Sequence, residues 1–258
     1  MTAAGLVLKQ VRAGEGVPAR VLIVVAHPDD ETVGLGGTLP LLEAATILQL
    51  TDGAPDWPAA WTRAGCPDRA AYRALRGAER EAAWTAAGWT VPVVACDAPD
   101  QQAHLRLSAL LAPLEVMLAT VEVVWTHPYE GGHPDHDTAA WLVQTACDRL
   151  GARAPGRLEF ASYHSNGLKR IAGDFWPCDW AAVRVAIPEE RLAQKQRALA
   201  AYVSQASVLR WFTPAMERYR IAPRYDFTHP PPPPAVWYER LGWPTTGAQW
   251  RAAVARAS

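Results

Sequence analysis

A short run of apolar residues, Val21 to Val25, most constrains what this chain can fold into. The run is apolar at every position and rich in β-branched side chains, which is typical of a central strand buried on both faces. It stops at His27, after which Pro28 and the acidic residues 29–31 suit the first turn of a helix. The sequence therefore predicts that His27 lies at the carboxyl end of a central strand, where open α/β sheets bind ligands.

A second segment repeats this pattern further along the chain. The stretch 121–125 has strand character and leads to His133-Pro-Asp-His136, a close chemical copy of His27-Pro-Asp-Asp30. Each segment delivers imidazole and carboxylate side chains just after a strand. Because the carboxyl ends of neighbouring parallel strands share one edge of a sheet, both groups can converge on one divalent cation. We therefore expect a metal site that is built by two strand ends.

Strand and helix signals alternate along much of the chain. Strands are expected near 46–50, 91–96, 121–125 and 158–164, and helices near 38–45, 70–87 and 134–150. This alternation predicts an α/β fold with a Rossmann-like, doubly wound, largely parallel sheet and helices on both faces. We expect one domain over 1–258, with a core over about 20–205 and a proline- and aromatic-rich C-terminal extension over about 206–258.

Two stretches rich in proline stand apart from this alternation. The stretch 54–69 has no clear period and combines prolines with two tryptophans, so we expect a long loop that forms an ordered lid near the site. The five consecutive prolines at 230–234 predict an extended strap across the surface.

Composition excludes several classes of partner. The 25 basic and 26 acidic residues give a formal charge of −1, so no field of one sign favours nucleic acid or a membrane surface. The four cysteines are dispersed without C-x-x-C spacing, which argues against a thiolate zinc site or a disulfide framework. No apolar run is long enough to span a membrane, so we expect a soluble, cytoplasmic protein. A homo-oligomer is compatible with the sequence.

The two motifs together resemble the signature of the zinc-dependent de-N-acetylases named after PIG-L and LmbE. Further stretches that resemble this family are Leu50-Thr-Asp-Gly53, Arg76-Gly-Ala-Glu79, Lys195-Gln-Arg-Ala-Leu199 and Ser204-Gln205. The resemblance covers most of 20–205. It implies a deacetylase that hydrolyses the acetamide of an N-acetylated amino sugar, such as N-acetylglucosamine, or of a related small-molecule sugar conjugate.

Amide hydrolysis at neutral pH is assisted by a metal that activates water and polarises the carbonyl group. Catalytic zinc keeps three protein ligands and one open position. His27, Asp30 and His136 are the three ligand candidates, and the resemblance implies the same assignment. Their nitrogen and oxygen donors suit Zn²⁺ but leave Fe²⁺, manganese or cobalt open.

The remaining polar residues of the two motifs suggest how the reaction proceeds. Asp29 projects about 100° away from Asp30 on a helix, so we expect it to act as general base and acid on the metal-bound water that attacks the amide. In similar enzymes the residue matching His133 stabilises the oxyanion while protonated, and Asp135 would hold that imidazolium. His127 is a rival ligand, although we interpret it as structural or supporting.

Two further residues remain open. Arg76 matches an arginine that contacts substrate hydroxyls or phosphate in similar enzymes, but a helix arginine paired with Glu79 is an equal alternative. Some relatives carry a tyrosine two residues before the first histidine of the second motif, where this chain has Gly131. Tyr129 would replace that tyrosine only if the loop brought it to the site.

Two other functions compete with sugar deacetylation. The same fold and metal site would serve an amidase that acts on a different amide or an S-conjugate, with the substrate set by 54–69 and the C-terminal extension. Alternatively, the protein binds a glycan through its tryptophans without catalysis. Metal content separates this non-catalytic alternative from the two hydrolases.

Overall fold

The computed structural model describes residues 1–233 and 235–257 and contains a seven-stranded sheet. The strand order is β3-β2-β1-β4-β5-β9-β8, in which the first five strands are parallel to one another. Strand β9 is antiparallel to both of its neighbours, β5 and β8. The strands are β1 (Val17–Val25), β2 (Leu42–Pro55), β3 (Val93–Asp100), β4 (Val123–Thr126), β5 (Gly156–Phe160), β8 (Ala182–Ala186) and β9 (Met216–Ile221). A separate hairpin pairs β6 (Tyr163–Ser165) with β7 (Arg170–Ala172). The predicted α/β fold with a largely parallel sheet is confirmed.

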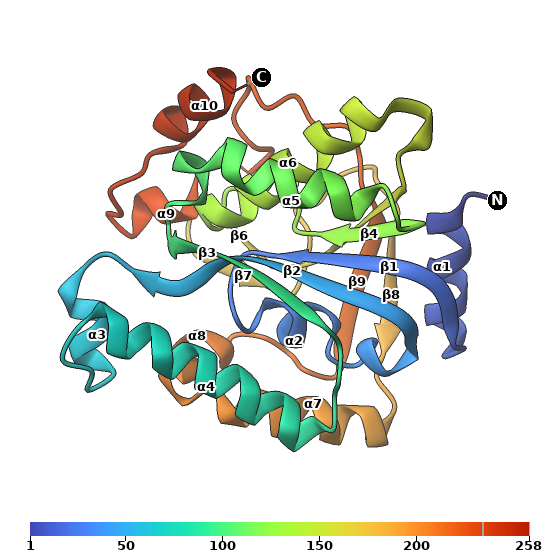
Figure 1. Ribbon diagram of the computed structural model, residues 1–258, viewed down its shortest axis with the longest axis horizontal. Coiled ribbons are helices and arrows are strands. Elements are labelled where there is room, and N and C mark those ends of the chain that lie inside the picture. The colour runs from blue at the N-terminus through green and yellow to red at the C-terminus, as the bar shows by residue number, and fades with distance from the viewer. Residues whose placement is uncertain (234, 258) are drawn as a thin grey trace.

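Helices cover both faces of this sheet (Figure 1). One face carries α5 (Leu107–Leu118), α6 (Pro134–Leu150) and α10 (Gly247–Ala255). The other carries α2 (Asp30–Leu35), α4 (Arg69–Ala87) and α7 (Glu189–Ala201). Shorter helices are α3 (Pro58–Arg63), α8 (Ala206–Leu209) and α9 (Trp237–Arg240), and α1 (Ala3–Ala13) precedes the first strand. In the described residues, no helix is both long and apolar enough to cross a membrane.

The central strand β1 is buried on both faces, as its continuous apolar sequence predicts. Val21, Ile23 and Val25 belong to the core under α4 and α7. Leu22 and Val24 belong to the core under α5 and α6. Each of the five side chains is 1% exposed or less. Burial of such side chains contributes about 1.5–3 kcal/mol each, which anchors the end of the strand that leads to His27.

Two expected elements differ from the structure. The helix expected over 38–45 is wrong, because this stretch contains only a 3₁₀ turn, Leu39–Leu41, before β2 begins at Leu42. Pairing with β1 explains the difference, since Leu42 already lies opposite Val17 in the sheet and this outweighs local helix propensity. The stretch 54–69, expected to be a loop, contains the short helix α3.

Part of the sequence expected to form a C-terminal extension lies within the sheet. Strand β9 pairs with β5 on one side and with β8 on the other. Its two buried charged residues, Glu217 and Arg220, give the strand a polar sequence that hides its inner position. Pro234, the last residue of the predicted proline strap, lies outside the described residues.

Candidate active site

The two motifs meet at the carboxyl edge of the parallel strands. Strands β1 and β4 are direct neighbours, and α6 begins with His133 at its N-cap. Ligand atoms of His27, Asp30 and His136 all lie within 4.8 Å of one another. We refer to these three residues as the histidine–carboxylate cluster. The two motifs are far apart in the sequence, but the pairing of β1 with β4 brings them together in the fold.

Within the histidine–carboxylate cluster, one carboxylate faces two imidazoles. Asp30 Oδ2 lies 3.2 Å from His27 Nδ1, and Asp30 Oδ1 lies 3.3 Å from His136 Nε2. His136 is buried, yet neither of its ring nitrogens has a hydrogen-bond partner in the described residues. Because a buried nitrogen without a partner is costly, this geometry fits a bound cation. Two nitrogens and a carboxylate oxygen are ligands that suit zinc and related divalent metals.

Two glycines permit the close packing around this cluster. A Cβ atom on Gly34, in α2, would lie 2.3 Å from the Phe160 ring of β5. A Cβ atom on Gly132 would lie 2.0 Å from the Tyr163 carbonyl oxygen. Both positions therefore need glycine for the two motif segments to reach the same edge of the sheet.

The second nitrogen of His27 is held by carboxylates from other elements. His27 Nε2 lies 3.2 Å from Asp100 Oδ1 and 3.3 Å from Asp135 Oδ2. The Asp135 carboxylate also accepts hydrogen bonds from the backbone N–H groups of Gln101 and Ala103. Carboxylates in this position orient metal-binding imidazoles in proteins. The arrangement leaves Nδ1 of His27 directed at Asp30.

Asp100 is a site residue that sequence reasoning missed. It joins His27, His133 and Asp135 in a second group whose ligand atoms lie close together. Its position at the end of a predicted strand could have identified it. Strand β3 is parallel to β1 and β2, so it ends at the same edge of the sheet as the two motifs.

His133 and Asp135 are not paired in the way that the resemblance implies. His133 Nδ1 accepts a hydrogen bond from the Asp135 backbone N–H, whereas the Asp135 carboxylate lies 3.9 Å from Nδ1 and closer to His27. With Nδ1 as the acceptor of this hydrogen bond, Nε2 is the ring nitrogen left to act as a donor. His133 Nε2 lies 3.4 Å from Asp100 Oδ1.

Asp29 lies next to the histidine–carboxylate cluster and is paired with Arg76. Arg76 Nη2 donates to Asp29 Oδ2 over 2.9 Å and to the Pro28 carbonyl over 3.1 Å, while Nη1 lies 3.3 Å from Glu79. Burial raises the pKa of Asp29 to about 7, and the Arg76 charge opposes this rise. Arg76 is almost fully buried and pairs with Glu79, as one of the two alternatives expected. It also lines the cavity described below.

His127 contacts the histidine–carboxylate cluster, whereas Tyr129 is held outside it. His127 Nε2 lies 3.3 Å from Asp30 Oδ2, and its ring stacks on that of His136 with the ring centres 3.9 Å apart. The Ala26 backbone N–H donates to His127 Nε2, and the other ring nitrogen pairs with Ser162 Oγ over 2.8 Å. The Tyr129 hydroxyl donates to the His229 carbonyl, and its ring stacks on Trp250. These contacts hold Tyr129 away from the proposed ligands, whereas His127 lies directly beside Asp30 and His136.

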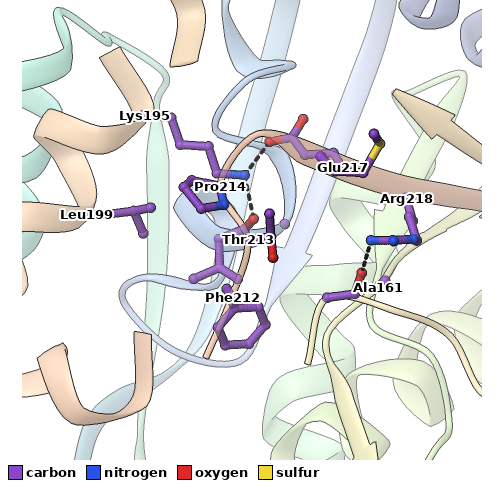
Figure 2. Close-up of a pocket in the computed structure, with 12 residues that line it drawn as sticks. Ala161, Lys195, Leu199, Phe212, Thr213, Pro214, Glu217 and Arg218 are labelled. Carbon is purple, nitrogen blue, oxygen red and sulfur yellow. Dashed lines mark hydrogen bonds and ion pairs between the residues drawn. The ribbon is translucent and has the colours of Figure 1, made fainter. Parts of the chain in front are cut away.

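Helix α2, which begins with Asp30, is held towards its C-terminal end by a second buried group, and Figure 2 shows the Lys195–Glu217 pair of this group. Lys195 Nζ donates to the Val33 carbonyl over 2.8 Å and pairs with Glu217 Oε1 over 2.6 Å. Glu217 Oε2 accepts hydrogen bonds from the hydroxyl groups of Thr38 and Tyr219. We refer to Lys195, Glu217, Thr38 and Tyr219 as the lysine–glutamate cluster.

A cavity of about 1230 Å³ opens over the histidine–carboxylate cluster. Its wall includes Pro55, Trp57 and Arg63 from the stretch that was expected to lie near the site as a lid. Tyr163 also lines it, with its ring centre 5.2 Å from that of His136. The cavity exceeds the ~300–1,000 Å³ of typical small-molecule sites, so it has room for more than a monosaccharide.

The fold and the site define an α/β protein with a candidate metal site at the carboxyl edge of its parallel strands. Residues 22–147 match the family model PIG-L, described as GlcNAc-PI de-N-acetylase, so this part of the chain is a PIG-L domain. The resemblance predicted from the two motifs is thereby confirmed, and at the level of the family the domain is a deacetylase. A comparison with curated proteins gave no match.

Solved structures share the fold at low sequence identity. The A40926 pseudoaglycone deacetylase Dbv21 is 18% identical with a TM-score of 0.59, over 81% of this chain and 100% of that chain. A teicoplanin-biosynthesis deacetylase in complex with teicoplanin is 15% identical with a TM-score of 0.59, over 80% and 100%. GalB, a 4-carboxy-2-hydroxymuconate hydratase from Pseudomonas putida KT2440, is 19% identical with a TM-score of 0.56, over 80% and 98%. At these identities the likeness establishes the fold and leaves the reaction to the site.

Proposed function

We propose that this protein is a hydrolase that uses a divalent metal ion to remove the N-acetyl group from an amino sugar or a sugar conjugate. The observation that supports this most is the convergence of His27, Asp30 and His136 at the cavity, with Asp29 beside them. The match of 22–147 to a family of de-N-acetylases supports the same reaction. N-acetylglucosamine, the sugar in the family description, is the first candidate for the acetylated unit.

The histidine–carboxylate cluster would hold the metal, and zinc is the first candidate because two imidazoles and a carboxylate suit it. Fe²⁺ and other divalent transition metals accept the same ligands. When bound, such an ion supplies Lewis acidity that activates water and polarises the acetamide carbonyl. Asp135 and Asp100 keep His27 oriented through Nε2.

Asp29 is the proposed general base and acid. Its carboxylate lines the cavity and is fixed by the Arg76 guanidinium. As the water oxygen bonds to the acetamide carbon, Asp29 accepts a proton from that water. The carbon–nitrogen bond then breaks while Asp29 returns the proton to the leaving amine. The products are acetate and the free amino sugar.

His133 is proposed to stabilise the negative charge that develops on the carbonyl oxygen. Its Nδ1 is engaged by the Asp135 backbone N–H, which leaves Nε2–H as the donor. A fixed donor in a site shielded from water stabilises such a charge. Arg76 is proposed to contact substrate hydroxyls or a phosphate from the cavity wall, in addition to holding Asp29.

The test is hydrolysis by the metal-loaded protein. N-acetylglucosamine and its glycosides should release acetate and a primary amine in equal amounts, and the rate should fall on chelation and return with zinc. Release of amine only from amides that carry no sugar would favour the alternative amidase. Sugar binding without release, in a protein that retains no metal, would favour a glycan-binding protein.

A further inference from the structure

The β6–β7 hairpin places a positive charge in the cavity without a negative partner. Arg170 begins β7 and lines the cavity. Its guanidinium carbon lies 5.5 Å from the centre of the Tyr163 ring and 5.4 Å from that of Trp211. Across 1–233 and 235–257, no carboxylate pairs with this guanidinium and no acceptor takes a hydrogen bond from it. Arg170 is half-buried, so its N–H groups have lost water without gaining a protein acceptor.

A second arginine shares the same tryptophan. The Arg210 guanidinium carbon lies 5.3 Å from the Trp211 ring centre, and Arg210 likewise has no carboxylate partner in the described residues. Burial lowers the pKa of Arg170, and the positive charge of Arg210 lowers it further. Two guanidinium groups around one indole repel each other, and an anion bound beside them would relieve that repulsion.

The charges that line the cavity are segregated. The carboxylates of Asp29, Asp30, Glu79 and Asp100 are each 15% exposed or less. Among the basic lining residues, Arg76 is neutralised by two of these carboxylates. The others, Arg63, Lys169 and Arg170, form no ion pair within the part of the chain that the structure describes. The cavity therefore has a deep acidic end and a shallower wall that carries unpaired positive charge.

We propose that Arg170 is a specificity residue that binds an oxyanion, a carboxylate or a phosphate, on the substrate. This inference rests on the proposed deacetylase function, with the acetamide at the histidine–carboxylate cluster. The Tyr163 ring is close to both positions, with its centre 5.2 Å from that of the His136 ring and 5.5 Å from the Arg170 guanidinium carbon. The anionic group therefore belongs near Tyr163, on the sugar that carries the acetamide or on the group joined to it. The planar guanidinium suits such bidentate oxyanions.

The experiment compares three sugars on the metal-loaded protein by calorimetric binding and by amine release. N-acetylglucosamine is neutral, N-acetylmuramic acid adds a carboxylate, and N-acetylglucosamine 6-phosphate adds a phosphate. We expect at least one anionic sugar to bind about 10- to 100-fold more tightly than the neutral sugar, the range of a charge-assisted hydrogen bond. Which of the two binds more tightly identifies the anion.

Variants separate a specific subsite from general positive charge. Arg170→Gln should remove the preference for the anionic sugar, while Arg170→Lys should retain part of it. The matched control is Arg63→Gln, which removes an exposed cation from the same cavity and should change the preference less than about twofold.

Equal binding of all three sugars, no binding of any of them, or a preference that survives Arg170→Gln would overturn the subsite. Loss of the preference in Arg63→Gln to the same extent would overturn it too, because the effect would then be general charge. Failure of the deacetylase proposal looks different. In that case no sugar releases amine, although the anion preference in binding and its dependence on Arg170 remain.

Discussion

Two buried charged clusters contact helix α2, one at its first residue, Asp30, and the other towards its C-terminal end, and they differ in how their polar atoms are satisfied. In the lysine–glutamate cluster, Lys195 pairs with Glu217 (Figure 2). Lys195 and both oxygens of Glu217 have partners at hydrogen-bond distance. In the histidine–carboxylate cluster, both ring nitrogens of the buried His136 lack a hydrogen-bond partner among the described residues, although Nε2 lies 3.3 Å from Asp30 Oδ1. The first cluster adjoins a space of only about 10 Å³, whereas the second opens into about 1230 Å³.

Buried charge alone therefore does not identify a functional site in this protein. The lysine–glutamate cluster joins α2, α7 and β9 with paired groups, and its effect is to fix the helix that carries Asp30. The histidine–carboxylate cluster leaves ligand atoms free and faces a cavity, which is what binding an ion and a substrate requires. Mutations in the first cluster should act on stability, and mutations in the second should act on chemistry.

The largest expected effect is that of Asp29→Asn on turnover. Loss of the proposed general base should lower the rate of amine release about 1,000-fold, within the range of general acid–base catalysis. The bound metal should remain, because Asp29 lies outside the proposed ligands. Amine release and metal content measured on the same sample check both statements. Asp148→Asn, an exposed aspartate on α6, is the matched control and should behave like the wild type.

The next effect, on stability, is that of Lys195→Met. Removal of one partner of a buried ion pair leaves the Glu217 charge uncompensated, so we expect a loss of about 3–5 kcal/mol in the free energy of unfolding. Urea unfolding monitored by tryptophan fluorescence measures the loss. The double variant Lys195→Met with Glu217→Gln should recover part of it. A loss of less than about 1 kcal/mol in the single variant would show that the lysine–glutamate cluster does not stabilise the fold as proposed.

A smaller effect is expected for Asp135→Asn, which weakens the support of His27 while leaving the three proposed ligands in place. Loss of a carboxylate that orients a metal-binding imidazole typically lowers metal affinity about 10- to 100-fold. Competition with a chromogenic zinc chelator measures this affinity. Unchanged affinity would mean that the contact of Asp135 with His27 does not position a ligand.

The smallest effect is expected at the surface. Arg149 and Glu115 form an ion pair over 2.7 Å, about as short as that of Lys195 and Glu217, but both side chains are at least 34% exposed. Arg149→Gln should therefore change the free energy of unfolding by less than about 1 kcal/mol. A loss as large as that of Lys195→Met would mean that burial does not distinguish the two pairs.

The sequence was most informative where chemistry and local structure coincide. His27, Asp30 and His136 stand out because two similar motifs each follow a strand, and the sheet then brings the strand ends together. Asp100 and Arg170 were missed because they reach the cavity from β3 and from the β6–β7 hairpin, whose positions depend on the sheet topology rather than on a local motif.

The missed strand has a related cause. Strand β9 lies between β5 and β8, but it reads as polar because Glu217 and Arg220 are charged. These charges are compensated by distant residues, Lys195 for the first and Glu159 for the second. Periodicity in a single segment does not reveal such partners, so inner strands with buried ion pairs are easily taken for surface segments.

The most direct measurement is anomalous X-ray diffraction at the zinc edge from crystals of the zinc-loaded protein. We predict one strong peak per chain, within bonding distance of His27 Nδ1, a carboxylate oxygen of Asp30 and a ring nitrogen of His136. A peak bound instead by Asp100, His133 and Asp135, or no peak from protein that still hydrolyses acetamides, would contradict the assignment on which the proposed reaction is built.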